Sequence, residues 1–472
     1  MTKAKGDFSQ GSVVKTIFRL AIPIFLAELV HLAYNIVDRV FIARMPETGT
    51  AALTGVGIAF PLISLITAFA NLAGMGGAPL MSIARGEGDN DKAQRIQETS
   101  FTMLLITGAV LTAVMFIWCP TFLSLMGGDE ETLPYALDYF RIYVLGIIPV
   151  LIGLGMNPFI NGQGFATIGM GTVMIGAALN IVLDPLLIYT AGMGVKGAAV
   201  ATVISQFVSA VWAVGFLVSK RPIIPVRKLR IEGEHLLSIV KLGVTGFTFK
   251  ATNSVVQTII NVTLKAWGGP LSTLYIGSMS IINSIRELVM CPCNGVMSGA
   301  TPVTSFNYGA DKPARVVTSL KTMLVSSIVI ASVFWAIMVF VPQWMFGIFT
   351  ADQALIELGS KCGRIYFLTF PLMAFQLTGQ NTFVALNFPK YALFFSMLRK
   401  IILVAPLTIV LPYLFNNVGF CYFIVSLIQS KEAVAKLPSN LLSLALGCLI
   451  LVLGCSVLLT AYKKHAAKKR GA

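Results

Sequence analysis

"GGAPLMSIARGEGDNDKAQR" at residues 76–95 and "SGATPVTSFNYGADKPARV" at residues 298–316 share one order of small, apolar and basic residues. Pro79 in the first stretch corresponds to Pro302 in the second. Gly86 corresponds to Gly309 at the same offset along the chain. A stretch that recurs in this way predicts a chain built from two related halves.

A third block shows the same offset. "FRIYVLGIIP" around Arg141 returns as "GRIYFLTFP" around Arg364, and the separation equals that between the two prolines. An offset that stays constant over three separate blocks is typical of an internal duplication rather than of chance similarity.

The composition indicates which solvent surrounds the chain. Hydrophobic residues make up 56% of the 472 residues, charged residues 12%, and the mean hydropathy is +0.81. A soluble protein carries about 25% charged residues. Continuous apolar runs of about 20 residues recur, and each can cross a bilayer core as a helix. The sequence therefore predicts an all-α integral membrane protein.

The apolar runs predict about twelve transmembrane helices. They fall at 14–43, 51–83, 98–121, 134–159, 168–190, 196–219, 241–267, 272–304, 318–341, 362–385, 391–416 and 439–462. Six helices in each half give both halves one orientation, so we expect two lobes related by a pseudo-twofold axis along the membrane normal. The run at 418–430 is too short to span, and we expect it to be interfacial or re-entrant.

These boundaries predict four parts of the chain. They are an N-terminal lobe at 1–219, a basic linker at 220–240, a C-terminal lobe at 241–462 and a basic tail at 463–472. The net charge is +15, and the basic residues are concentrated in alternate loops, in the linker and in the tail. This asymmetry is the positive-inside pattern. It predicts a multi-pass protein of the cytoplasmic (inner) membrane with both termini in the cytoplasm, and it argues against a nucleic-acid partner.

Signatures of enzymes and of metal sites are missing from the sequence. There is no H-E-x-x-H, G-x-S-x-G or P-loop motif, and the three histidines are far apart. The seven cysteines have neither the spacing of a zinc site nor that of a disulfide framework. We therefore expect no enzymatic activity, no resident cofactor and no structural metal.

The first helix carries a polar stripe. Glu28, His31, Asn35 and Asp38 are spaced by 3, 4 and 3 residues, which places them on one helix face, with Tyr34 beside them. Because an ionisable group in the bilayer costs about 2.5–3.5 kcal/mol, such a stripe suggests a function. A polar seam between helices is the plainer alternative. We expect the stripe to line a cavity.

The seventh helix carries a second stripe, formed by Lys250, Asn253, Gln257 and Asn261. Under nearly the same offset Lys250 corresponds to Glu28, so both halves present a polar helix face at equivalent places. We expect one water-filled cavity between the lobes, with cargo contacts from both stripes.

The fifth helix contains "LNIVLDPLLIY", in which Asn180 and Asp184 lie one turn apart. Pro185 lacks an amide donor, so it leaves the carbonyl of Ile181 free. A carboxylate, an amide oxygen and a free carbonyl suit a sodium ion or a proton relay. A buried neutral aspartic acid is the alternative.

Arg286 and Glu287 are adjacent in the eighth helix, and we expect them to face different partners, either in the cavity or in a structural role. Arg399 and Lys400 lie in the eleventh helix, where long side chains can reach the membrane surface.

Four segments together resemble the multidrug and toxic compound extrusion (MATE) family, in its bacterial and archaeal branch typified by the DNA-damage-inducible F type. They are "LAYNIVDRVFIAR" at 32–44, "LNIVLDPLLIY" at 179–189, "GVKGAAVATVISQ" at 194–206 and "NSIRELVMCPCNGVMSGATPVTSFNYGA" at 283–310. The resemblance covers residues 12 to 420. After Gly419 the sequence departs from the family pattern, which leaves the packing of the last helix open.

The resemblance implies an antiporter, in which entry of H⁺ or Na⁺ drives export of small, amphipathic, often cationic compounds by a monomer in the bilayer. It implies a cation-coupling site at Asp38, Asn180 and Asp184, with further contributions from Asn157, Thr202 and Tyr139. It also implies a hinge in the first helix at Pro23.

The sequence does not choose between the two coupling ions. A lipid-linked oligosaccharide flippase of the same superfamily is the alternative function. Its pyrophosphate-bearing cargo would need a strongly cationic cavity, whereas here Lys250 and Arg286 stand against three acidic residues, namely Glu28, Asp38 and Asp184.

Overall fold

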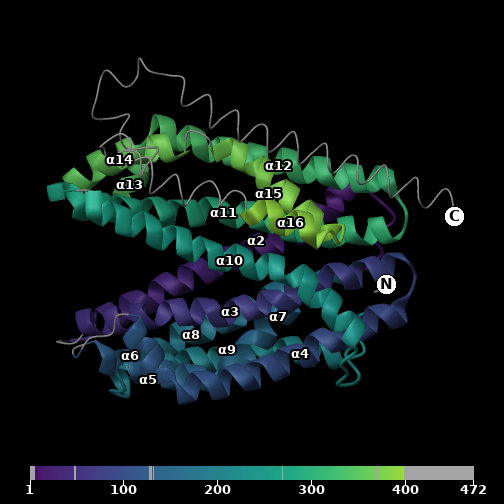
Figure 1. Ribbon diagram of the computed structural model, residues 1–472, viewed down its shortest axis with the longest axis horizontal. Helices are drawn as coiled ribbons and strands as arrows, with labels where there is room; N and C mark the ends of the chain where they lie inside the picture. Colours follow the sequence, from purple (N-terminus) through teal and green to yellow (C-terminus); the bar gives the residue numbers. More distant parts are fainter. Residues whose placement is uncertain are drawn as a thin grey trace. The chain divides into compact units, whose positions relative to one another are not determined.

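The computed structural model describes residues 6–46, 49–126, 130, 132–267, 269–367 and 370–397. Within these ranges the chain forms helices joined by short connections, without a β-strand (Figure 1). The short run predicted at 418–430, the last predicted helix, the basic tail, Arg399 and Lys400 lie outside the described residues.

The helices of the first half of the sequence follow the predicted apolar runs. They are α2 (Val13–Ala43), α3 (Gly49–Gly86), α4 (Asn90–Ile117), α5 (Cys119–Leu125), α6 (Leu133–Leu145), α7 (Ile147–Gly162), α8 (Ala166–Pro185), the π-helical turn η1 (Leu186–Thr190) and α9 (Val195–Val218).

The described helices of the second half also lie on the predicted runs. They are α10 (Gly233–Trp267), the 3₁₀ turn η2 (Gly269–Leu271), α11 (Ser272–Gly309), α12 (Pro313–Phe340), α13 (Pro342–Gly347), α14 (Gln353–Phe367), α15 (Phe370–Ala385) and α16 (Pro389–Met397). Helix α10 begins at Gly233, before the predicted start at 241, so the non-helical linker is shorter than predicted.

Five described helical stretches are long and apolar enough to cross a membrane. They are Ala51–Gly86, Asn90–Ile117, Ala166–Thr190, Val195–Val218 and Pro313–Phe340. Helices α6 and α7 together make a sixth candidate, which is bent by 60°. The helices with the predicted polar stripes, α2 and α10, are not among these candidates.

The helix predicted at 134–159 is interrupted and forms α6 and α7, which together make one candidate span. The chain bends at Gly146, whose N–H bonds the carbonyls of Tyr143 and Val144 and so ends α6. Pro149 follows within the first turn of α7, where it has no amide donor and its ring excludes the straight continuation of α6. The proline that interrupts the helix was visible in the sequence, but the direction of the bend was not.

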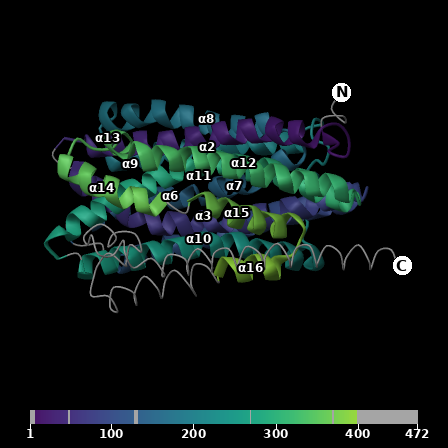
Figure 2. The ribbon, with the colours of Figure 1, turned by 90° about the horizontal axis from the view of Figure 1, so that it is seen from above.

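The described chain divides into two compact units. The first contains residues up to 251 together with 295–319 and 384–389, and the second contains 252–294, 320–383 and the described residues from 390 onward. Within the first unit, α3 packs against α4 and α7 (Figure 1), while α8 lies between α2 and α9. Figure 2 shows α2 and α8 running side by side. Within the second unit, α13 packs on α14.

Helices α3 and α11 cross at the two glycines that the duplication pairs. A Cβ at Gly86 would meet the carbonyl oxygen of Phe306, and a Cβ at Gly309 would meet the carbonyl oxygen of Ile83. Phe306 is the counterpart of Ile83 at the offset that relates Gly309 to Gly86, so the duplication exchanges the two contacts. Only residues without a side chain allow the two backbones to approach this closely.

The basic linker is docked on α4 and α7 through buried polar side chains. Glu98 Oε1 accepts the backbone N–H groups of Arg227 at 2.9 Å and Lys228 at 3.1 Å. Gln163 Oε1 accepts the N–H of Ile224 at 2.8 Å, and its amide Nε2 donates to the Ile224 carbonyl at 3.2 Å. The linker backbone is therefore fixed, while the long side chains of Arg227 and Lys228 stay exposed.

We predict that Glu98→Ala frees this linker. Glu98 is buried with 2% of its surface exposed, and its loss leaves two backbone donors without an acceptor, at a cost of about 1–3 kcal/mol each where they remain buried. Trypsin should then cleave after Arg227 and Lys228 faster than in the unaltered protein. The matched control is Glu87→Ala, because the exposed Glu87–Lys92 ion pair contributes little. Equal cleavage of both variants would contradict this role of Glu98.

Candidate functional site

The centre of the candidate site is a pair of carboxyl groups from two helices of the first unit. Asp38 on α2 and Asp184 on α8 are in direct side-chain contact. Asn180, one turn before Asp184, donates from Nδ2 to Asp184 Oδ1 at 3.1 Å. Asn180 and Asp184 are buried, with 2% and 0% of their surfaces exposed. The structure thus brings together the three residues that were predicted to bind the coupling cation.

Three oxygens of this cluster have no hydrogen-bond partner in the described part of the chain. They are Asp38 Oδ1, Asn180 Oδ1 and Asp184 Oδ2, and all are shielded from solvent. Buried polar atoms are normally hydrogen-bonded, so unpartnered acceptors at one place call for an explanation. Three acceptor oxygens can be satisfied by a proton or by a hard cation.

Arg39 is adjacent to Asp38 in the sequence, but its guanidinium stacks on another residue. Its Cζ lies 4.6 Å from the centroid of the Phe60 ring on α3. This contact directs the Arg39 side chain toward α3 and not toward the polar stripe. Among the ion pairs of the described residues, none joins Arg39 to the carboxyl pair.

The backbone after Asp184 leaves the α-helical pattern. Helix α8 ends at Pro185, and η1 continues as a π-helical turn in which the N–H of Ala191 bonds the carbonyl of Leu186 at 2.8 Å. Tyr189 in this turn donates from its hydroxyl to the Phe41 carbonyl of α2 at 2.6 Å. Isolated π-helical turns are frequent at functional sites, and this one ties the end of α8 to α2 beside the carboxyl pair.

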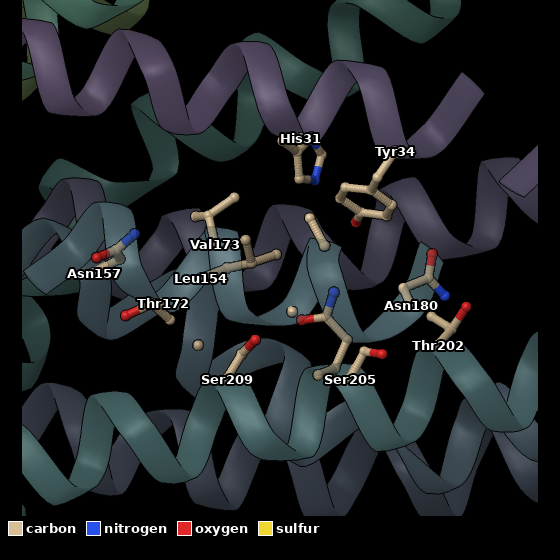
Figure 3. Close-up of a pocket in the computed structure, with 14 residues that line it drawn as sticks. His31, Tyr34, Leu154, Asn157, Thr172, Val173, Asn180, Thr202, Ser205 and Ser209 are labelled. Atoms are coloured by element: carbon tan, nitrogen blue, oxygen red, sulfur yellow. The ribbon is translucent and has the colours of Figure 1, made fainter. Parts of the chain in front are cut away.

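A pocket opens next to the cluster, between α2, α7, α8 and α9. Its empty volume is about 470 Å³, part of which is open to solvent. Figure 3 shows His31 and Tyr34 extending into it from α2, and Ser205 and Ser209 from α9 on the opposite side. Asn180 also lines it, so the pocket leads to the carboxyl cluster.

The weaker site predictions, Asn157, Thr202 and Tyr139, lie at this pocket or beside it. Asn157 and Thr202 line the pocket. Tyr139, buried on α6, is in hydrogen-bond contact with Thr202. Asn157 donates from Nδ2 to the Gly169 carbonyl at 3.2 Å, which turns it toward the start of α8 rather than toward Asp184.

The rest of the α2 stripe is divided between the pocket and the surface. Asn35 donates from Nδ2 to the His31 carbonyl at 2.6 Å and lies 3.3 Å from His31 Nδ1. The His31 and Tyr34 rings pack edge to face, with centroids 5.1 Å apart. Glu28 is exposed one turn earlier, and Pro23 is buried within α2, which continues through it as one helix.

Sequence reasoning missed the α9 side of the pocket. Gln206 lines the pocket and is in hydrogen-bond contact with Tyr34. Ser205 and Ser209 line it as well, and Ser205 Oγ is buried without a partner in the described chain. Their spacing with Thr202, at intervals of three and four residues, is a polar stripe of the same kind as that on α2 and was the available signal.

The second unit contains Arg286 and Glu287, and the expectation that they face different partners is wrong. Arg286 Nη2 donates to Glu287 Oε1 at 3.1 Å, since two long side chains can curl toward each other from adjacent positions. The guanidinium also contacts the Tyr366 hydroxyl. The side chains of Lys250, Asn253, Gln257 and Asn261 are outside what the structure describes, so the predicted cargo contacts on α10 stay predictions.

Among the described residues, no group of three or more His, Cys, Asp or Glu side chains is arranged to hold a metal ion. The described cysteines Cys119, Cys291, Cys293 and Cys362 are buried. A sodium site at Asp38, Asn180 and Asp184 would need oxygen ligands beyond its two carboxyl groups, such as the Asn180 amide.

Comparison with known proteins gives one family match. The MatE family model matches residues 23–186 and 251–410, one segment in each half of the chain. The multidrug export protein MepA of Staphylococcus saprophyticus is 24% identical over 417 residues, which cover 88% of this chain and 91% of that protein. MepA of Staphylococcus aureus (strain NCTC 8325) is 23% identical over 376 residues, covering 79% and 82%.

Solved structures show the same fold. A MATE protein in a bent conformation aligns with a TM-score of 0.86 at 21% identity, covering 98% of this chain and 99% of that one. An outward-facing multidrug resistance MATE transporter of the MOP superfamily aligns at 0.83 with 22% identity and 98% coverage of both chains. A MOP superfamily transporter from Pyrococcus furiosus aligns at 0.83 with 24% identity, covering 96% and 98%. The chain therefore has the fold of these transporters, as predicted from the sequence.

The packing of α8 against α7 yields a test. A Cβ at Gly169 would press against the side-chain oxygens of Asn157 and Asn161, both buried without partners in the described chain. We predict that Gly169→Ala lowers the unfolding temperature in detergent, as expected for about 1–3 kcal/mol of overpacking. Gly171→Ala on the same helix meets the Trp212 ring at 3.4 Å and should be neutral. Equal unfolding temperatures of the two variants would mean that α7 moves aside without cost and that the predicted overpacking does not occur.

Proposed function

The chain belongs to the MatE family of membrane transporters, and from this premise we propose that it exports amphipathic, often cationic organic compounds in exchange for an entering proton or sodium ion. It is a multi-pass membrane protein. We place it in the cytoplasmic membrane with both termini inside, as the distribution of basic residues favours.

The contact between Asp38 and Asp184 is the observation that carries this proposal. Two carboxylates that touch away from water repel each other strongly, because the effective dielectric constant is low there. A proton shared by the pair, or a sodium ion that also takes the Asn180 oxygen, removes this repulsion. Binding and release of such a cation would change how firmly α2 is held against α8.

The energy available from this exchange is sufficient for export. One positive charge that enters down a potential of 100 mV releases about 2.3 kcal/mol. With tight one-for-one coupling, that energy supports a concentration ratio of roughly 50 for a neutral cargo. Exchange for a singly charged cationic cargo moves no net charge, so it draws on the concentration gradient of the coupling ion instead. Alternating access then requires that the occupied and empty cation site favour different conformations of the same chain.

The proposed conformational step lies in α2. Pro23 lacks the amide that would bond the carbonyl of Arg19, so bending there costs less than elsewhere in the helix. Asp38 and the pocket residues His31 and Tyr34 are all on the same side of Pro23 in the sequence. A bend at Pro23 would therefore move the cation site and the pocket wall together.

The pocket also bears on the class of cargo. Its described lining contains no Asp, Glu, Lys or Arg side chain, and two acidic groups, Asp38 and Asp184, lie beside it with one basic group, Arg39, next to Asp38. A cationic cargo is favoured by this charge, whereas a pyrophosphate-linked lipid would be repelled. The observation favours multidrug export over the flippase alternative.

Cargo efflux from proteoliposomes under separately imposed sodium and proton gradients tests the function and identifies the coupling ion.

We predict that Asp184→Asn abolishes uphill transport without unfolding the protein. The amide has nearly the size of the carboxyl, but it removes the charge that the coupling cation must neutralise. Asp38→Asn should behave alike, and the double variant should be little worse than either one, since the two groups act as one site. The measurement is accumulation of a cationic dye in inside-out vesicles.

Asp138→Asn is the matched control, because Asp138 lies in the same unit but pairs at the surface with Lys196 at 3.5 Å. It should accumulate the dye like the unaltered protein. Uphill transport that survives in the double variant would locate the coupling site in the second unit, with Glu287 the next residue to test.

A further inference from the structure

The segment that precedes α2, residues 6–11, packs on the first unit with Gly6 and Phe8 buried; we call it the N-terminal strap. Phe8 has 0% of its surface exposed, and its ring packs edge to face on Phe306 of α11 with centroids 5.7 Å apart. Asn307, the next residue of α11, donates from Nδ2 to the Phe8 carbonyl at 3.0 Å. A short peptide ahead of the first helix is thus packed like part of the core.

Arg315 of α12 binds three carbonyl groups of the strap. Its Nη2 donates to the carbonyls of Phe8 at 2.9 Å and Gln10 at 3.0 Å, and its Nη1 donates to that of Gly11 at 2.8 Å. Its Nε donates to Asn307 Oδ1 at 2.9 Å, which fixes the plane of the guanidinium. A planar fork with several donors suits such a set of acceptors, whereas a lysine could not match it.

Two further cationic side chains bind carbonyl groups of the strap. Lys312 donates from Nζ to the Ser9 carbonyl at 3.1 Å. Arg85 at the end of α3 donates from Nη2 to the Gly6 carbonyl at 2.8 Å and from Nη1 to the Gly162 carbonyl at 2.7 Å. The Arg85 guanidinium carbon also lies 5.5 Å from the centroid of the Phe306 ring.

One acidic group belongs to the strap. Burial alone would raise the pKa of Asp7, but the hydrogen bonds from Ser9 and the charges of Lys312 and Arg85 outweigh it, so this pKa lies below its ordinary value. Asp7 Oδ1 accepts the N–H of Ser9 at 2.8 Å, which curls the strap backbone. The carboxylate therefore stays charged at neutral pH beside these cations.

The strap bridges the two sequence halves where their helices touch. Arg85 lies at the end of α3 in the first half, while Asn307 and Arg315 belong to α11 and α12 of the second half. Gly86 and Gly309, at which α3 and α11 cross, lie within two positions of Arg85 and Asn307. Separation of α3 from α11 would pull Arg85 away from Arg315, and the strap could not keep its bonds to both.

We propose that the N-terminal strap is a latch that holds this end of the first unit closed and must leave its site before α3 and α11 can separate. The inference rests on the proposed alternating-access function for its purpose, but the contacts that carry it are independent of cargo or coupling ion. Because most bonds go to backbone carbonyls, the latch depends on Phe8 and on the cationic residues rather than on the other strap side chains.

The first test measures closure without transport. Ala84, fully buried on α3 beside Arg85, is replaced by cysteine in a full-length chain whose seven native cysteines are removed. We expect deletion of residues 2–11, or Arg315→Ala, to raise the rate of maleimide labelling of Ala84→Cys by roughly tenfold or more, as for loss of several charge-assisted hydrogen bonds. Gln10→Ala is the matched control and should leave the rate unchanged, because Gln10 contributes its carbonyl.

Arg315→Lys keeps the charge but loses the fork, and it should give an intermediate rate. If size-exclusion chromatography shows that the truncated chain and Arg315→Ala do not fold, the labelling rate of Arg315→Lys alone decides the test. A labelling rate that equals that of the parent in every folded strap variant would overturn the latch. This result needs no cargo, so it stands even if the chain proves to transport nothing.

The second test asks whether release is required. Phe8→Cys and Phe306→Cys in the same cysteine-free chain place two thiols near the Cβ positions of rings whose centroids are 5.7 Å apart, so a cleavable bifunctional thiol reagent can join them. We expect the cross-linked protein to lose dye export and to regain it on cleavage of the link. Export that continues at the unlinked rate in fully cross-linked protein would refute the requirement for release. If the unlinked chain exports no dye, the proposed function fails. The maleimide labelling rates of the first test then decide whether the strap is a latch.

Discussion

The crossing of α3 and α11 at Gly86 and Gly309 is the constraint on which much of the first unit depends. In a bilayer, lipid chains are as apolar as the helix surfaces, so helices gain little from hiding apolar area and associate through close packing. At this crossing a carbonyl of each helix occupies the place where a side chain of the other would start. The contact is reciprocal because Phe306 repeats Ile83 at the offset of the duplication. One close approach thereby fixes α3, with its neighbours α4 and α7, relative to the end of α11.

The candidate site follows from a second constraint, the cost of polar groups in a helix bundle surrounded by lipid. Helix α8 is in contact with both α2 and α9, so the polar faces of all three are turned toward one another rather than toward lipid. Most polar atoms there find a partner, as Asn180 Nδ2 does in Asp184. One oxygen of each carboxyl, Asp38 Oδ1 and Asp184 Oδ2, has no partner in the described chain. Stability alone does not favour such a pair, whereas a reversible cation site requires it.

Much of this could be predicted from the sequence, because both signals are periodic. The constant offset between corresponding blocks indicated the duplication, and intervals of three and four residues placed His31 and Asp38 on one helix face. The bend between α6 and α7 could not be derived, since Pro149 indicates a break but not its angle of 60°. The N-terminal strap and the docked linker were also missed. Both are held through backbone groups, which every residue has, so their own side chains carry little signal.

The pairing of Arg286 with Glu287 shows a related limit of periodicity. Helical spacing fixes where a Cα lies, but a side chain of Arg can reach around the helix to its neighbour. The same reach works across elements in the case of Arg315, which lies on α12 and binds residues that precede α2. Long cationic side chains of this kind connect segments whose proximity no periodic pattern in the sequence predicts.

Helix α2 connects the N-terminal strap to the carboxyl cluster. It begins at Val13, directly after the strap, and it carries Asp38 near its far end, at a distance of roughly 38 Å by the rise of an α-helix. Pro23 lies between them and is the position at which α2 bends at least cost. A rigid helix would transmit any shift of Asp38 to the strap, whereas a helix that bends at Pro23 would confine the shift to the carboxyl cluster. Whether α2 is rigid or bends at this proline therefore decides whether neutralisation of the carboxyl pair changes the structure where α3 and α11 cross.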